Sequence, residues 1–287
     1  MIIFDRDILK IRRKKALDRT FLHAADFDFL HREVADRLSE RLEEVERNFK
    51  SPLQMGMLGG LLPSLMSHRH MTKADRTPYP DRQIIELDEE NLPHEQGKYD
   101  LIVSNLLMHW VNDLPGALIQ MQRALKPDGL FIASLFGGES LKELRHSLMI
   151  AESEISGGVS PRISPFVDIR DAGSLLQRAG FALPVTDMDT LTVEYESPLK
   201  VMQDLRGMGE SNAVLDRRKG LTPPSLMMRA AEIYQQQFGL PNGKVPATFQ
   251  IVYLTGWHPH ESQQKPLRPG SAQNRLAEAL KTTEDKF

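Results

Sequence analysis

Two short apolar runs, Tyr99-Asp-Leu-Ile-Val-Ser-Asn105 and Leu130-Phe-Ile-Ala-Ser-Leu-Phe136, decide the fold class. Runs of this kind are typical of strands buried on both faces, as in parallel sheets. Between them, apolar residues recur at helical spacing from Leu114 onward, and Lys126-Pro-Asp-Gly129 is a turn sequence. A strand, a helix and a second strand make a βαβ unit. The stretch therefore predicts an α/β fold with a parallel sheet, in which strands end at Asn105 and Phe136.

The segments on either side continue this alternation. Leu30, Val34, Leu38 and Leu42 form one apolar stripe of a helix that needs a sheet or a bundle to cover it. The basic segment 1–20 is interpreted as a solvent-exposed arm, with a partner-binding patch as the alternative. Further strands are expected just before the Gly-rich apolar segment 52–62 and near 84–87, 190–195 and 247–257. Further helices are expected near 140–154, 169–179, 198–207 and 225–237.

Length and composition exclude several classes of protein. The chain has 287 residues, of which 40% are apolar and 26% are charged, as in an ordinary globular protein. The net charge is −3 and the pI is about 6.3, which gives no support to bulk nucleic-acid binding. Cysteine is absent, so a thiol nucleophile and cysteine-ligated metals are excluded.

The organisation of the chain follows from these patterns. We expect an N-terminal helical arm over 1–48, a main domain over 49–257 with a helical insertion at about 198–240, and a loose tail over 258–287. No apolar run is long enough to span a bilayer, which predicts a cytoplasmic protein without an integral membrane segment and leaves peripheral membrane association open.

Several residues near predicted strand ends could bind a cofactor. The glycines of Gly56-Met-Leu-Gly59-Gly60 would let the backbone approach a ligand, although such loops also serve packing. Asp75 could bind ribose hydroxyls, or be a surface acid. Asp88 could accept from an adenine amino group. Asn105 ends a central strand, where open α/β sheets bind their ligands.

A second group of candidates could act on a substrate. His109 and Trp110 follow the strand at 99–105, and could stack on a ligand or move a proton, or only pack the next helix. Gly207-Met-Gly-Glu-Ser-Asn212 could form a lid over a pocket, or a helix cap. The histidine pairs at 68/70 and 258/260 give little support to a metal site.

Larger motifs resemble a known family. The segments beginning at Phe4, Tyr99, His109 and Leu125 resemble the class I S-adenosylmethionine-dependent methyltransferases. Among these, the chain resembles most the family of NADH:ubiquinone oxidoreductase complex assembly factor 5 and its bacterial relatives. The matching segments include Phe136-Gly-Gly-Glu-Ser-Leu141, and the most specific are Gly207-Met-Gly-Glu-Ser-Asn212 and Val245-Pro-Ala-Thr-Phe-Gln250.

The resemblance implies a Rossmann-like methyltransferase fold with a seven-stranded, mostly parallel sheet, an antiparallel last strand and a helical lid. It implies S-adenosylmethionine as cofactor, a complex I subunit as protein partner, and hydroxylation of an arginine of that subunit. The implied cofactor residues are Gly56, Gly60, Asp75, Asp88 and Asn105. The implied catalytic residues are His109 and Glu210, with Trp110, Arg145, Ser211 and Asn212 on the substrate.

The first methyltransferase motif departs from the family pattern. Gln54 stands where the family has an acid, and Leu58 stands at the middle glycine. Loss of the acid removes a charge-assisted partner of the cofactor's ammonium group, worth roughly 1.5–3 kcal/mol. The stretch between Asp75 and Asp88 is also about one helix short. Methyl transfer to a small molecule or carrier-bound acid, and a non-catalytic chaperone, are therefore alternatives to hydroxylation.

Overall fold

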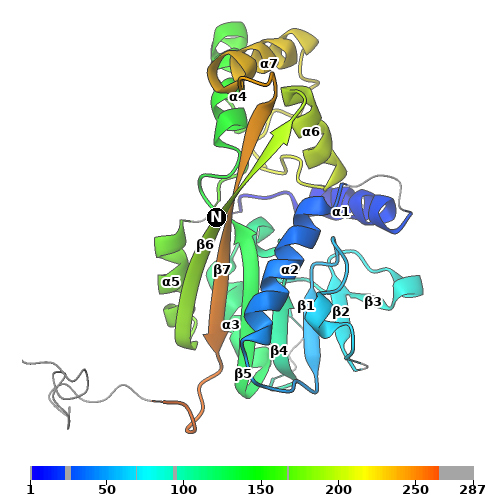
Figure 1. Ribbon diagram of the computed structural model, residues 1–287, viewed down its shortest axis with the longest axis vertical. Helices are drawn as coiled ribbons and strands as arrows, with labels where there is room; N and C mark the ends of the chain where they lie inside the picture. The colour runs from blue at the N-terminus through cyan, green and yellow to red at the C-terminus, as the bar shows by residue number, and fades with distance from the viewer. Residues whose placement is uncertain (1, 23–26, 69, 93–95, 167, 265–287) are drawn as a thin grey trace, which may run out of the picture.

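The computed structural model describes residues 2–22, 27–68, 70–92, 96–166 and 168–264 (Figure 1). Its centre is a seven-stranded sheet in the order β3-β2-β1-β4-β5-β7-β6. The five strands from β3 to β5 run parallel, and β7 is antiparallel to both β5 and β6. The predicted fold class is confirmed. The strands are β1 Pro52–Met55, β2 Thr72–Asp75, β3 Ile84–Glu86, β4 Tyr99–Ser104, β5 Leu125–Phe136, β6 Ala182–Tyr195 and β7 Val245–Trp257.

The βαβ unit lies at the middle of this sheet. β4 and β5 pair in parallel, with Leu101 opposite Leu130 and Ser104 opposite Ala133, so their carboxyl ends meet at one edge as predicted. β5 begins earlier than the sequence pattern indicates. The turn residues 126–129 lie inside the strand as an irregularity, where Asp128 has a φ of 63°.

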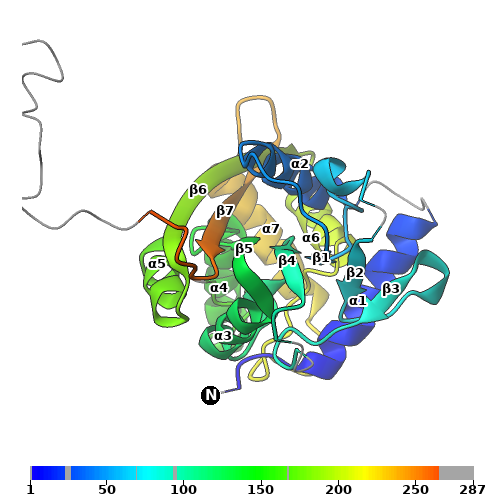
Figure 2. The ribbon, with the colours of Figure 1, turned by 90° about the horizontal axis from the view of Figure 1, so that it is seen from below.

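Helices cover both faces of the sheet (Figure 2). On one face, the apolar stripe of α2 packs with strand residues such as Leu101 of β4 and Leu130 of β5. On the other face, α3 and α5 pack with the alternate residues, such as Ile102 of β4 and Phe131 of β5. This alternation is the expected consequence of the two-residue period of a strand. The helices are α1 Arg6–Phe21, α2 Phe29–Glu43, α3 Leu114–Ala124, α4 Lys142–Ser156, α5 Ile169–Arg178, α6 Pro198–Gly207 and α7 Pro224–Phe238, with short 3₁₀ turns η1 Pro63–Leu65, η2 Pro80–Arg82 and η3 Met108–Trp110.

A second helical layer lies beyond the carboxyl edge of the parallel strands. β6 and β7 pair from Ala182 opposite Trp257 to Tyr195 opposite Val245, and their upper halves extend past the other strands (Figure 1). Helices α4, α6 and α7 pack around this extension. The helices α6 and α7 lie within the predicted insertion, whereas α4 joins them from the preceding part of the chain.

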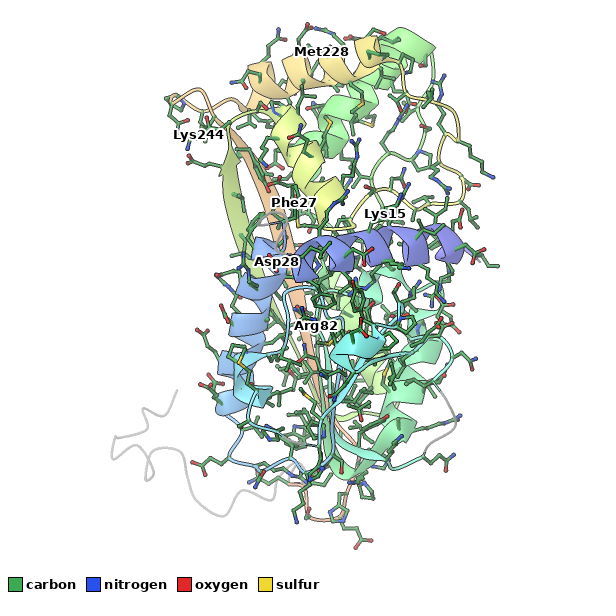
Figure 3. The ribbon with its side chains drawn as sticks, turned by 90° about the vertical axis from the view of Figure 1, so that its right-hand side faces the viewer. Lys15, Phe27, Asp28, Arg82, Met228 and Lys244 are labelled. Atoms are coloured by element: carbon green, nitrogen blue, oxygen red, sulfur yellow. The ribbon has the colours of Figure 1, made fainter. Side chains whose placement is uncertain are left out.

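Helix α1 lies crosswise between the sheet and this upper layer, near Lys15 in Figure 3. Asp5 caps its first turn by accepting a hydrogen bond from the backbone N–H of Ile8 at 3.2 Å. Leu9 and Leu17 are buried, and Arg13 is only 6% exposed. The interpretation of residues 1–20 as a solvent-exposed arm is therefore wrong, because one face of α1 is part of the interior.

None of the helices among the described residues is long and apolar enough to cross a membrane. The predicted tail over 258–287 falls mostly outside the described residues.

Candidate active site

A buried carboxylate lies between two histidines at the carboxyl edge of the sheet. Glu210 Oε2 is 3.0 Å from Nε2 of His109, and Glu210 Oε1 is 3.8 Å from Nε2 of His31. The Glu210 side chain is 4% exposed, and both imidazoles are fully buried. The three residues come from α2, from η3 after β4, and from the loop after α6. The fold therefore brings together His109 and Glu210, which were predicted to be catalytic, and His31, which was not predicted.

The end of α6 explains why Glu210 points inward. Gly209 has a φ of +82°, a left-handed conformation that glycine adopts without strain. The backbone N–H of Glu210 donates to the carbonyl of Leu205 at 2.8 Å, as in the motif that commonly terminates helices. The helix-cap alternative for this segment is thus correct for Gly209. It does not exclude a role for Glu210, whose side chain is left free to enter the site.

Electrostatics keep Glu210 ionised. Burial opposes ionisation, but the charge and hydrogen bond of His109, with a contribution from His31, outweigh it and lower the pKa of Glu210 to about 2. Burial also lowers the pKa of His31, against the attraction of Glu210. Both ring nitrogens of His31 and Nδ1 of His109 have no hydrogen-bond partner among the described residues. The site therefore combines a carboxylate with unsatisfied imidazole nitrogens.

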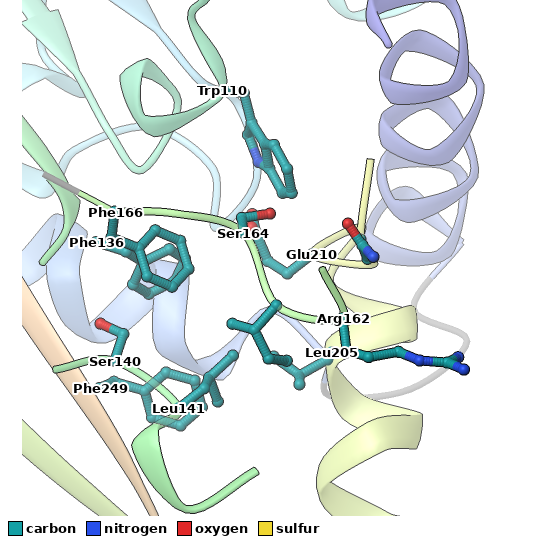
Figure 4. A pocket seen from close by; sticks show the side chains of 12 residues that line it. Trp110, Phe136, Ser140, Leu141, Arg162, Ser164, Phe166, Leu205, Glu210 and Phe249 are labelled. Atoms are coloured by element: carbon teal, nitrogen blue, oxygen red, sulfur yellow. The ribbon is translucent and has the colours of Figure 1, made fainter. Parts of the chain in front are cut away.

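An aromatic cavity opens beside this carboxylate (Figure 4). Its walls include Trp110, Phe136 and Phe166, and the ring of His109 lies 4.7 Å from that of Phe136, measured between centroids. Ser140 and Ser164 add hydroxyl groups. A carboxylate beside aromatic rings can pair with a planar cation such as guanidinium, which also stacks on the rings. The cavity has about 20 Å³ of free space, so a guanidinium would enter only if the lining side chains move apart.

The remaining residues predicted to bind substrate divide into two sets. Asn212 lines the aromatic cavity, and Ser211 lines a wider cleft beside it. The Arg145 guanidinium instead donates to the backbone carbonyls of Gly138 and Ser140, both at 3.1 Å, and it lines neither space. The structure gives Arg145 a role in fixing the loop after β5, and substrate contact by this residue stays a prediction.

The predicted ribose acid Asp75 is closed off by α1. Its oxygens accept from Arg13 Nε at 2.7 Å, from Arg13 Nη2 at 3.0 Å and from the backbone N–H of Met57 at 2.8 Å. The backbone N–H of Thr77 lies 3.4 Å away. An ionised carboxylate has about four acceptor positions, and here they all face protein donors. The Asp75 side chain is 0% exposed, so ribose hydroxyls have no access to it.

Gly56 and Asn105 are also committed to protein contacts, whereas a side chain at Gly60 would meet open space. A side chain at Gly56 would lie 2.3 Å from the carbonyl oxygen of Asn105, so this glycine permits close packing within the protein. The Asn105 amide donates to the carbonyl of His31 at 3.0 Å and accepts from Ser134 at 3.1 Å. Gln54 bonds the loop itself, donating to the carbonyl of Gly60 at 2.9 Å.

Asp88 lies apart from this group, half exposed and paired with Arg6 of α1. Buried Leu58 packs with Leu17 of α1, which covers the loop. As the structure arranges them, these residues do not offer S-adenosylmethionine the predicted ribose contact, because Arg13 of α1 pairs with Asp75 and Leu17 packs with Leu58. Among the described residues, no group of three or more His, Cys, Asp or Glu is arranged to hold a metal ion.

Comparison with known proteins shows to which family the chain belongs. Residues 27–184 match a family model described as a methyltransferase domain. The mitochondrial arginine-hydroxylase NDUFAF5 of Danio rerio is 41% identical over 98% of this chain and 90% of its own length. The human protein of that name is also 41% identical, over 94% of this chain and 81% of its own length. The chain belongs to this family. It is a relative of NDUFAF5 with a methyltransferase fold.

More distant relatives agree on the fold. Malonyl-acyl-carrier-protein O-methyltransferase of Halorhodospira halophila is 35% identical to this NDUFAF5 relative over 79% of the chain and 81% of its own length. The crystal structure of the YcgJ protein of Bacillus subtilis superposes with a TM-score of 0.52 at 13% identity, covering 78% of this chain and 98% of that one. At that identity the likeness concerns the fold alone.

The sequence analysis did not identify two residues that shape the site of this family member, His31 and Arg13. His31 lies on the buried stripe 31/35/38/42 of α2, and Arg13 lies on the stripe 9/13/16/17 of α1. A polar residue on a buried helical face was the available signal. For Arg13, the interpretation of segment 1–20 as exposed hides this signal.

The low pKa of Glu210 predicts a loss of stability in acid. The unfolded chain takes up a proton near pH 4.5, whereas the folded Glu210 does so only near pH 2. The free energy of unfolding should therefore fall as the pH drops from about 4.5 towards 2, and Glu210→Gln should reduce this slope. Urea unfolding at several pH values measures it. Glu196→Gln, at an exposed position outside the site, is the control, and equal slopes in both variants would contradict the assignment.

Proposed function

We propose that this protein hydroxylates an arginine of a respiratory complex I subunit, and so acts as an assembly factor of that complex. The observation that supports this function best is the ionised Glu210 at the end of an aromatic cavity. Relatives that are named arginine-hydroxylases and align along nearly the whole chain support the same reaction. The sequence resemblance points to the subunit that binds the terminal iron–sulfur cluster as the partner.

The cavity suggests how the substrate arginine is recognised. Oε2 of Glu210 is engaged by His109, whereas Oε1 has its nearest described imidazole nitrogen at 3.8 Å, beyond hydrogen-bond distance. Oε1 can therefore accept an N–H of an incoming guanidinium. Trp110 and Phe136 would contact the faces of that planar cation. His109 fixes the carboxylate and can exchange a proton through its unpaired Nδ1.

Hydroxylation breaks one C–H bond and forms one C–OH bond, which is a two-electron oxidation of the arginine. With dioxygen as oxidant, the second oxygen atom leaves as water and a reductant supplies two electrons and two protons. We assign recognition and positioning of the arginine to the residues described above. The oxidant and the reductant come from outside this set.

Co-expression with the candidate subunit tests the proposal directly. Peptide mass analysis of the purified subunit should show the gain of one oxygen atom on an arginine, and growth under labelled dioxygen should label that atom. A strain that lacks the gene provides the unmodified control. A subunit that is identical with and without the protein would refute the hydroxylase assignment, and a gain of one methyl group would favour the methyltransferase alternative.

The closed loop over β1 predicts that adenosyl cofactors bind weakly or not at all. Binding would have to displace Arg13 from Asp75 and move α1 off Leu58. Calorimetric titration with S-adenosylhomocysteine should give no saturable heat at ligand concentrations that saturate a malonyl-carrier-protein methyltransferase relative. Tight binding by the unmodified protein would show that α1 opens readily and that the methyltransferase alternative deserves priority.

A further inference from the structure

A second, wider space opens next to the aromatic cavity. It is a cleft of about 590 Å³ between α1, α4, α6 and the segment around 211–222. Arg162, Leu205, Glu210 and Asn212 line both spaces, so the cleft leads directly to the candidate active site. Its size is within the range of ordinary ligand pockets.

The charge of the cleft is strongly one-sided. Glu210 is the single acid among the residues that line it, and it is already engaged by His109. The protein as a whole carries a net charge of −3, so this concentration of positive charge is local. The basic lining residues are Arg12, Arg162, Arg206, Arg217, Arg218 and Lys219.

Half of these cations lack a strong partner. Arg206 and Lys219 make no side-chain hydrogen bond or ion pair with the described residues, and both are exposed. Arg218 makes only a 3.4 Å hydrogen bond, to Ser156. By contrast, Arg162 and Arg217 form ion pairs, with Glu152 at 2.6 Å and with Asp5 at 3.1 Å. These three cations line the cleft without an ion-pair partner among the described residues, so an anionic group bound there would be stabilised.

The fixed cations also repel one another. Burial and the nearby charge of Arg217 lower the pKa of Arg12, against the attraction of Asp5. Arg12 is held by the backbone carbonyl of Ser211 at 2.9 Å, and a carbonyl neutralises no charge. An incoming anion would therefore relieve a repulsion that already exists in the free protein.

The floor of the cleft is apolar. Leu144 and Leu148 of α4, Met202 and Leu205 of α6, and Met227 of α7 lie beneath the basic rim. None of the lining residues is aromatic, so the cleft lacks the stacking platforms that single-stranded nucleic acids use. A basic rim above an aliphatic floor matches a peptide that carries both carboxylates and aliphatic side chains.

We propose that this cleft binds an acidic, aliphatic peptide segment of the protein substrate, adjacent to the arginine that enters the aromatic cavity. The inference rests on the proposed function for the position of the arginine. Arg206, Arg218 and Lys219 pair with the carboxylates of the segment, and the methionines and leucines contact its aliphatic side chains. Specificity for the substrate thus comes from charge next to the modified residue as well as from the arginine itself.

Fluorescence anisotropy with synthetic peptides tests the cleft. One labelled peptide has a central arginine flanked by glutamate and leucine, and its partner has glutamine in place of each glutamate. The glutamate peptide should bind at least about tenfold more tightly than the glutamine peptide, with a difference that shrinks at high salt. Equal affinity of the two peptides, or no binding of either, would overturn the proposal.

Charge reversal locates the binding. Arg206→Glu combined with Lys219→Glu should abolish the preference for the glutamate peptide. Arg123→Glu combined with Arg178→Glu changes the net charge by the same amount at exposed positions outside the cleft, and should preserve the preference. Equal losses in the two double variants would overturn the proposal. The proposal would also be overturned if the glutamate peptide does not bind, while phosphatidylserine vesicles bind the unmodified protein but not the cleft variant.

Modification of the co-expressed subunit, measured for the same variants, separates this inference from the proposed function. If the unmodified protein binds the acidic peptide through the cleft but no arginine is hydroxylated, the hydroxylase assignment fails and the cleft inference stands. If the cleft variant hydroxylates the subunit as well as the unmodified protein does, the cleft inference fails and the hydroxylase assignment stands. Melting temperatures of both double variants verify that they fold.

Discussion

Arg13→Ala is expected to lower the free energy of unfolding by about 3–5 kcal/mol, as for other broken buried ion pairs. The substitution leaves the Asp75 carboxylate at 0% exposure, without the two guanidinium hydrogen bonds that balance its charge. It also removes a side chain from the contact between α1 and the loop after β1. Urea unfolding followed by circular dichroism measures the loss.

Two comparisons identify its cause. Lys10 lies one turn earlier on the same helix and pairs with Glu86 at a site where both side chains are about half exposed. Lys10→Ala should therefore cost less than about 1 kcal/mol. Arg13→Met together with Asp75→Asn removes both charges and keeps an acceptor for the backbone N–H of Met57, so it should restore much of the lost stability. A loss for Arg13→Ala as small as that for Lys10→Ala would mean that α1 does not seal the region over Asp75.

The fold was predictable from the sequence because its signals are local. The buried runs 99–105 and 130–136 and the apolar stripe of α2 each follow from a short period within one element. Element boundaries were less accurate. β6 begins at Ala182 rather than near 190. Its first half lies at the edge of the sheet and carries Pro184, Asp187 and Asp189, so apolar residues alternate less regularly there than over 190–195.

The site was only partly predictable, because it depends on contacts between distant segments. Arg13 and Asp75 are 62 positions apart, and His109 and Glu210 are 101 apart. Nothing in a local pattern indicates that Asp75 meets an arginine rather than a ribose. The family motif placed Glu210 near the substrate, but it gave no indication that His31 would lie on its other side.

The degenerate glycine motif shows how little of a loop's internal contacts a sequence pattern reveals. Gln54 and Leu58 suggested a weakened cofactor site. In the structure, Gln54 bonds its own loop and Leu58 packs against Leu17 of α1. The substitutions at 54 and 58 thus remove expected contacts to the cofactor and add contacts within the protein. The sequence pattern reveals the lost contacts but not the new ones.

Glu210→Gln is expected to reduce hydroxylation of the substrate arginine by roughly ten- to a hundredfold, because the variant keeps the size of the side chain and removes its charge. A guanidinium that enters the cavity then meets a neutral amide, and one charge-assisted hydrogen bond is lost. Modification of the co-expressed subunit measures the effect. Some loss of thermal stability should accompany it, since His109 also loses its charged partner.

A comparison of two peptides separates recognition of the arginine from a purely structural role of Glu210. Citrulline has nearly the shape of arginine but is uncharged, so the unmodified protein should bind an arginine peptide more tightly than its citrulline counterpart. In Glu210→Gln this difference should largely disappear, whatever happens to the melting temperature. Glu210→Asp retains the charge and should retain part of the difference. If Glu210→Gln still prefers arginine as strongly as the unmodified protein does, another group recognises the guanidinium, and Glu210 serves to hold His109 and α6 in place.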